Sequence, residues 1–246
     1  IKRFYYRLFI LLMAKNIQEI VAIIDRSGSM YGKETNTIGG INTMINELKE
    51  KKDKDEEIFL SIKLFDHEQK ILYDSINIDN IKQLDVNDLV PRGQTALLDA
   101  IGDTLSQFIE KKLSNNGVFK SCIIYVATDG YENASKRYNK EMIKKIISNA
   151  ELNYNISMVY LGANQDAIME AASIGIKFDS AINYCENTDN INSVYRSVAR
   201  VASTVRKDGS APSFTQQERY NSNTISNETP RPPLLRRQTD IALTKN

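Results

Sequence analysis

The sequence is poor in the residues that build disulfide frameworks and transition-metal sites. It contains only two cysteines, Cys122 and Cys185, and neither lies in a Cys-x-x-Cys motif or a Cys/His cluster. They fit reduced thiols in a cytosolic protein better than a disulfide framework. The single histidine, His67, falls in a predicted turn without cysteine or histidine companions, so we expect a solvated turn residue and not a ligand. It also gives no basis for a Ser-His-Asp triad.

The chain also lacks an excess of charge of either sign. Lysine and arginine together number 32, against 31 for aspartate and glutamate. Proteins that bind nucleic acid or a membrane surface usually carry a basic face, so this balance supports neither partner. A Walker-type Gly-rich loop ending in Lys-Ser/Thr is missing as well, which makes nucleotide hydrolysis by this chain alone unexpected.

Near the N-terminus, the apolar run is too short to span a membrane. The apolar run over residues 8–13 is short and falls far below the roughly 20 residues that a transmembrane helix needs. Basic residues precede this run, as in a signal peptide, but no small-residue cleavage site follows it. We expect translation to start at Met13 and residues 1–15 to form a non-native or flexible extension. The alternative is a short basic membrane anchor.

Apolar runs of strand length alternate with segments of helical period along most of the chain. With 246 residues, 41% of them hydrophobic, the chain can build one sizeable core. The alternation predicts a doubly wound, mostly parallel six-stranded α/β sheet with helices on both faces. A tight turn between the second and third strands makes the third an antiparallel edge strand. We expect strands at residues 20–25, 58–66, 69–74, 122–127, 156–161 and 180–184.

The composition changes after Lys207. Residues 208–246 are rich in Ser, Thr, Asn, Pro and Arg and contain few apolar side chains. Such a segment buries too little surface to offset the entropy lost on ordering, so we expect a disordered tail. An alternative for residues 231–237 is a short docking peptide. The folded domain is therefore expected over residues 16–207.

One predicted strand ends in a group of oxygen-bearing side chains. The apolar run 20–24 leads directly into Asp25, Ser27 and Ser29, which stand at alternate positions. Oxygen-only ligands favour Mg²⁺, Mn²⁺ or Ca²⁺ over softer metals, which would select His or Cys. In doubly wound sheets, ligands bind outside the carboxyl ends of the strands, where the strand order reverses. The pattern therefore predicts a divalent-cation site at the end of the first strand.

Two further oxygen ligands occur where this fold would deliver them. Thr95 lies in the loop that opens a predicted helix, and Asp129 follows the apolar strand 122–127. Because the carboxyl ends of parallel strands meet at one edge of a sheet, we expect Asp129 at the same edge as Asp25. Each signal is weak alone, but together the two converge on one point.

These residues resemble the metal-ion-dependent adhesion site (MIDAS) of the von Willebrand factor A (vWA) domain. That pattern is Asp-x-Ser-x-Ser followed by a distant Thr and a distant Asp, and the chain matches it in full. The resemblance extends over about residues 17–205. The matching residues are Asp25, Ser27, Ser29, Thr95 and Asp129. Other shared segments are Gly28, residues 95–100 and residues 128–130; residues 65–68, 131–135 and 162–166 look most like stand-alone members from bacteria and phages.

The resemblance implies a site for Mg²⁺ or Mn²⁺, with Ca²⁺ less expected. In the pattern of the family, Ser27, Ser29 and often Thr95 would coordinate the cation directly. Asp25 and Asp129 would act through water molecules. Neutral hydroxyl ligands leave the charge of the cation poorly neutralised, so an open position attracts an anionic oxygen. An Asp or Glu side chain of a partner protein is the natural sixth ligand.

Other interpretations compete with this one. Asp, Ser and Thr often act as helix N-caps without a metal, but caps do not explain two carboxylates at neighbouring strand ends. An EF-hand loop needs Gly at its sixth position and Glu at its twelfth, where this chain has Met30 and Asn36. An aspartyl-phosphate enzyme would need a second carboxylate at the position of Ser27 and a positioned lysine, and neither is evident.

We therefore expect a cytoplasmic, non-catalytic, metal-dependent protein-binding module. The alternative is a Mg²⁺-dependent hydrolase or phosphoryl-transfer enzyme that uses the same metal site. Gln94 and Tyr131 are predicted to lie on the rim that contacts the partner. Tyr131 would otherwise pack on a neighbouring helix. Neither a nucleic acid nor a membrane is expected as a partner.

Overall fold

The computed structural model describes residues 17–114, 119–163 and 166–223. In these ranges the backbone forms a six-stranded sheet with the strand order β3-β2-β1-β4-β5-β6. Strand β3 pairs antiparallel with β2, whereas the other neighbouring strands are parallel. The predicted mostly parallel sheet with one antiparallel edge strand is confirmed. The strands are β1 (Ile17–Asp25), β2 (Glu57–Phe65), β3 (Gln69–Asn77), β4 (Ser121–Thr128), β5 (Ile156–Gly162) and β6 (Ala181–Asn183).

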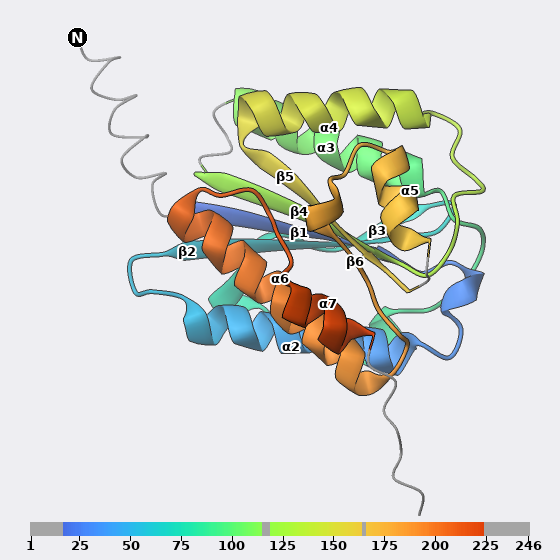
Figure 1. Ribbon diagram of the computed structural model, residues 1–246, viewed down its shortest axis with the longest axis horizontal. Helices are drawn as coiled ribbons and strands as arrows, with labels where there is room; N and C mark the ends of the chain where they lie inside the picture. The colour runs from blue at the N-terminus through green and yellow to red at the C-terminus, as the bar shows by residue number, and fades with distance from the viewer. Residues whose placement is uncertain (1–16, 115–118, 164–165, 224–246) are drawn as a thin grey trace, which may run out of the picture.

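Helices cover both faces of this sheet (Figure 1). Helices α2 and α6 pack together on one face, and α3, α4 and α5 pack on the other. Their bounds are α2 (Glu34–Lys51), α3 (Leu97–Leu113), α4 (Lys140–Tyr154), α5 (Ala167–Ser173) and α6 (Thr188–Asp208). The arrangement is the α/β architecture that the alternation of strands and helices predicts. Among the described helices, none combines the length and the apolarity that a membrane crossing requires.

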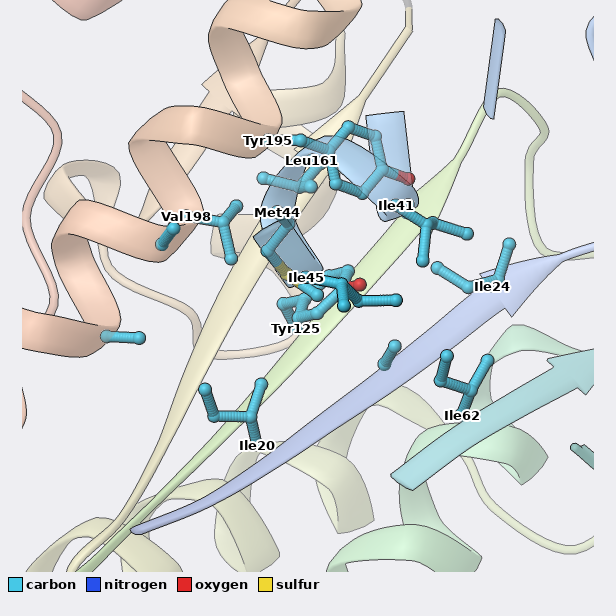
Figure 2. Packing of buried hydrophobic residues seen from close by; sticks show 14 of the residues in the cluster. Ile20, Ile24, Ile41, Met44, Ile45, Ile62, Tyr125, Leu161, Tyr195 and Val198 are labelled. Carbon is cyan, nitrogen blue, oxygen red and sulfur yellow. The ribbon is translucent and has the colours of Figure 1, made fainter. Parts of the chain in front are cut away.

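Strand β1 shows why the central strands are almost entirely apolar. Ile20 and Ile24 belong to the core cluster against α2 and α6, which Figure 2 shows from close by. Val21 and Ile23 belong to the cluster on the opposite face. Because successive side chains of a strand point to opposite faces, a strand that is covered on both sides needs apolar residues at every position.

The strand order reverses between β1 and β4. From β1 the chain passes to β2 on one side of the sheet, and it later returns to form β4 on the other side of β1. The register pairs Ile24 with Ala127, so Asp25 and Thr128 are the last residues of two adjacent strands. The crevice outside the carboxyl ends of strands at such a switch point is the usual place for a ligand.

The expectation of a disordered tail from residue 208 is wrong for residues 208–223. A further helix, α7 (Gln216–Ser222), packs against α6. Phe214 is buried just before it, and Thr215 caps its N-terminus in a capping box with Glu218. One buried aromatic side chain and a capped turn order this segment, and the average composition of the tail conceals both.

The remaining predictions about the chain ends lie outside the described residues. These are the extension over residues 1–15 with its proposed start at Met13, and the part of the tail from residue 224 onward. The possible docking peptide at residues 231–237 belongs to the second of these ranges.

Candidate metal centre

Asp25 ends β1 at the switch point, and it is fully buried. Its Oδ1 accepts a hydrogen bond from the backbone N–H of Ser27 at 2.7 Å, and its Oδ2 accepts one from Oγ1 of Thr128 at 2.6 Å. Burial raises the pKa of Asp25; hydrogen bonds from Thr128 and from the backbone and side chain of Ser27 offset this only in part, and the charge of Asp129 adds to the rise. Asp25 is therefore a buried carboxylate with neutral hydrogen-bond donors, and a bound cation would relieve its uncompensated charge.

The loop after β1 brings two hydroxyls to this carboxylate. A short 3₁₀ turn, Gly28–Met30, follows Ser27. The hydroxyl oxygens of Ser27 and Ser29 lie 3.0 Å apart, and Oγ of Ser29 donates to Oδ1 of Asp129 at 2.6 Å. Asp129 comes directly after β4, so this bond joins the ends of the two central strands. Ser29 is exposed, which opens the site to solvent.

Gly130 leaves a small volume free between the oxygens of the site. A Cβ atom on this glycine would lie 3.1 Å from Oγ of Ser29, 3.2 Å from Oγ1 of Thr95 and 3.6 Å from Oδ2 of Asp25. Oxygens from three separate segments therefore surround one point. Hydroxyl and carboxylate oxygens are the donors that Mg²⁺ and Mn²⁺ prefer, so the residues present fit a hard divalent cation. The structure brings together the predicted residues Asp25, Ser27, Ser29, Thr95 and Asp129.

The hydroxyls of the site do not act as helix caps. Thr95 lies one residue before the N-cap of α3, which is Ala96, and that helix start has no side-chain cap. Ser27 is the N-cap of the 3₁₀ turn, but its side chain makes no capping hydrogen bond either. The competing interpretation of these residues as ordinary N-caps is therefore wrong, and both hydroxyls remain able to bind a ligand.

The backbone of Thr95 is held by a reciprocal pair of hydrogen bonds. Its N–H donates to Oδ1 of Asn133 at 2.9 Å, and the N–H of Asn133 donates to the carbonyl oxygen of Thr95 at 3.0 Å. The loop before Thr95 also contacts the serine loop, because the N–H of Gly28 donates to the carbonyl oxygen of Gly93 at 3.1 Å. Gly93 has a φ of +68°, and a Cβ there would overlap the ring of His67.

Two carboxylates hold the loop after β4 against α3. Glu132 accepts from the N–H of Leu98, in the first turn of α3, at 2.8 Å and from the N–H of Ser135 at 2.7 Å. Asp99 accepts from three successive backbone N–H groups, those of Lys136, Arg137 and Tyr138. Burial alone would raise the pKa of Asp99, but these three bonds outweigh it and lower the pKa. The position of Asp129 and Gly130 thus depends on a well-bonded loop.

The buried carboxylate of Asp66, just after β2, pairs with arginines of the two loops that carry Ser27 and Thr95. Its Oδ2 lies 2.8 Å from Nε of Arg92 and 3.0 Å from Nε of Arg26. Arg26 stands in the serine loop, and Arg92 stands in the loop that leads to Thr95. His67, predicted as a turn residue, lies half-exposed in the turn between β2 and β3. Residues 65–68 were singled out only as part of the family resemblance, and the pairing of Asp66 with Arg26 and Arg92 was not predicted, because these partners are distant along the chain.

One lysine reaches the carboxylates of the site. Lys33 immediately precedes α2, and its ammonium group contacts Oδ2 of Asp129 and lies 2.5 Å from Oε1 of Glu186. Partial burial lowers the pKa of Lys33, but the hydrogen bonds to Asp129 and Glu186 outweigh it and raise the pKa. Sequence reasoning missed both Lys33 and Glu186, since neither belongs to the motif.

Both predicted rim residues are exposed. Gln94 lies in the loop before Thr95. Tyr131 is 55% exposed, and its hydroxyl donates to Oδ2 of Asp166, next to α5, at 2.9 Å. Tyr131 is therefore not buried against a helix, and its role as a partner contact stays a prediction, as does that of Gln94.

Comparison of the sequence with protein-family models and with curated proteins gives no match. Solved structures do match the fold. A von Willebrand factor type A protein from Catenulispora acidiphila aligns with a TM-score of 0.57 and 15% identity over 76% of this chain and 43% of that one. Proximal thread matrix protein 1 from the mussel byssus, with a zinc-occupied MIDAS motif, gives 0.55 and 15% over 76% and 48%. Manganese-loaded TRAP protein of Plasmodium vivax gives 0.52 and 18% over 71% and 70%.

These similarities concern the fold and not the activity of the whole proteins. The chain spans less than half the length of the first two proteins. Identities of 15 to 18% are too low to transfer a function. What the chain shares with the matched structures is the fold, here a mostly parallel sheet with one antiparallel edge strand and helices on both faces. The chain has the von Willebrand factor A fold.

Proposed function

We propose that the chain is a metal-dependent protein-binding module whose bound Mg²⁺ or Mn²⁺ coordinates an Asp or Glu side chain of a partner protein. The single observation that carries this proposal is the buried carboxylate of Asp25, which has neutral donors and lies among hydroxyls that cap no helix. Zinc in the MIDAS of the mussel protein and manganese in the Plasmodium protein support a divalent cation in this fold. The proposed ligands are Asp25, Ser27, Ser29, Thr95 and Asp129.

The donor set explains why the ligand would be acidic. Three of the five groups are neutral hydroxyls, so the two carboxylates are the only anionic donors among them. When bound, the cation supplies a positive charge that an outside carboxylate can neutralise. The chain itself fixes the positions of the ligands: Thr128 orients Asp25, and Asn133 holds Thr95. The exposed Ser29 leaves the site open to a partner.

We also propose that the protein acts in the cytoplasm. Cys122 is buried, Cys185 is partly buried, and both are free thiols. Unpaired cysteines are typical of reducing compartments.

A capture experiment tests the binding function. The chain is immobilised and exposed to cell lysate in Mg²⁺ or in EDTA, with the Ser27→Ala/Ser29→Ala double variant as the matched control. We expect a protein that is retained only in Mg²⁺ and only by the unmodified chain, and whose binding is lost when one of its own acidic residues is replaced. A protein that is retained equally in EDTA and by the double variant would contradict the proposal.

The enzyme alternative has a separate test. Generic phosphoester substrates are assayed with Mg²⁺ and with Mn²⁺, and Asp25→Ala serves as the blank. We expect no turnover above this blank. Turnover that disappears in Asp25→Ala would favour a metal-dependent hydrolase over a binding module.

A further inference from the structure

Lys33 places a positive charge on a carboxylate that the proposed metal site needs. Both oxygens of Asp129 are engaged: Oδ1 accepts from Ser29, and Oδ2 accepts from the ammonium group of Lys33. The side chain of Asp129 is only 2% exposed, so solvent screens this contact little. Because the ammonium group is positively charged and close to the site, it repels a metal cation.

Glu186 offers Lys33 a second partner. It lies in the segment between β6 and α6, and its side chain is 34% exposed. The ammonium group of Lys33 therefore bridges a carboxylate inside the site and a carboxylate on its rim. The side chain of Lys33 is itself 28% exposed and flexible, so it can turn toward Glu186 without a change in the backbone.

We propose that Lys33 sets the affinity of the site for its cation, because its ammonium group competes for Asp129, and that Glu186 weakens this competition by drawing the ammonium group away. The proposal rests on the metal site of the proposed function. In the absence of a cation, Lys33 neutralises Asp129. With a cation bound, Lys33 pairs with Glu186 and leaves Asp129 to the site. Lys33 and Glu186 are thus positioning residues that act on the metal site through Asp129.

The test measures the dissociation constant of Mn²⁺ by calorimetric titration. Lys33→Met removes the charge and keeps the aliphatic stem, and we expect it to bind Mn²⁺ about tenfold more tightly than the unmodified chain. Lys207→Met is the matched control. Lys207 lies in the last turn of α6, where it pairs with Asp53 at 2.9 Å, so its loss should leave the affinity within about twofold.

Glu186→Gln separates the two roles. We expect it to weaken Mn²⁺ binding about threefold in the unmodified chain, because Lys33 then stays on Asp129. In the Lys33→Met background the same change should have less than about a twofold effect. An equal effect of Glu186→Gln in both backgrounds would overturn the role of Lys33 as its intermediary.

The outcomes distinguish this inference from the proposed function. If neither the unmodified chain nor Lys33→Met binds Mn²⁺, the metal site itself fails. If the unmodified chain binds Mn²⁺ and Lys33→Met binds it equally or more weakly, only the competition fails. Thermal melting in EDTA confirms that each variant is folded, and Lys33→Gln replaces Lys33→Met if the latter does not fold.

Discussion

The two ends of the sheet both bury charged side chains, but they compensate them differently. At the amino end, the nearly buried Glu19 of β1 pairs with Lys111 of α3 and also accepts from Oγ of Ser75. At the same end, Arg206 of α6 lies with its Nε 2.9 Å from Oε1 of Glu56. Glu19 and Arg206 thus each have a partner of opposite sign.

At the carboxyl end, Asp66 is paired in the same way with Arg26 and Arg92, but the buried Asp25 accepts hydrogen bonds only from neutral donors among its described contacts. A nearby second carboxylate, Asp129, adds to the unfavourable environment. The lysine of this end, Lys33, contacts Asp129 instead. Within the described part of the chain, no positively charged side chain therefore pairs with Asp25.

The difference separates structural charges from a ligand site. A buried ion pair with good geometry holds elements of the fold together, and removal of one partner leaves an unpaired charge. A buried carboxylate that lies among hydroxyls, without a lysine or arginine partner, favours a bound metal cation. Changes to the ion pairs at the amino end should therefore alter stability alone, whereas changes to Asp25 and the side chains around it should alter metal affinity.

Among the substitutions, the largest expected loss of stability comes from Lys111→Met, which leaves Glu19 without its counter-charge. We expect the free energy of unfolding to fall by about 2 kcal/mol. That lies below the 3–5 kcal/mol typical of a fully buried pair, since Lys111 retains some exposure. Urea unfolding in EDTA measures the loss. The Mn²⁺ dissociation constant should not change, and a large change in it would break the distinction between the two ends.

At the carboxyl end of the sheet, Asn133→Ala should have a smaller effect, and this effect is on metal affinity. This change removes the side-chain acceptor that orients Thr95, so Mn²⁺ should bind about tenfold more weakly, the low end for residues that orient metal ligands. Ser135→Ala is the matched control, because Ser135 lies in the same loop but bonds Glu132 and Asp99. Equal Mn²⁺ affinities for Asn133→Ala and Ser135→Ala would contradict the role of Asn133.

The smallest effect concerns acid stability at the amino end. Burial would raise the pKa of Glu56, but its bond to Arg206 outweighs this and lowers the pKa from its ordinary value of 4.5. Its stabilising contribution is therefore complete above pH 4.5 and is lost as the pH falls through the lowered pKa. Glu56→Gln keeps a side-chain oxygen beside the buried Arg206 and removes only the charge, so it should destabilise the chain by about 1 kcal/mol at pH 7. Urea unfolding at several pH values should show this difference shrinking in acid; a difference that grows would contradict it.

The sequence predicted the sheet because its central strands are buried on both faces. Continuous apolar runs such as Ile20–Ile24 and Cys122–Ala127 have few alternatives to a parallel sheet strand. Once β1 and β4 are neighbours, Asp25 and Asp129 must lie at the same edge. The convergence of the site therefore follows from the fold class, and the motif supplied the residues.

The supporting contacts could not be predicted in this way. Lys33 pairs with Glu186, and Asp66 pairs with Arg26 and Arg92, although these partners are far apart in the sequence. Charged residues in loops are common, and no periodicity indicates which of them pair. The order of residues 208–223 was missed for a similar reason, because it depends on the burial of Phe214 against the folded domain.

Thermal unfolding with Mn²⁺ and with EDTA tests the central claim most directly, in the unmodified chain and in Asp25→Asn. Mn²⁺ at a hundredfold excess over its dissociation constant should stabilise the unmodified chain by about 2.7 kcal/mol. Asp25→Asn should show no such gain, and in EDTA it should be at least as stable as the unmodified chain, since it removes an uncompensated buried charge. An unmodified chain whose melting does not respond to millimolar Mn²⁺, or an Asp25→Asn variant that responds equally, would contradict the account.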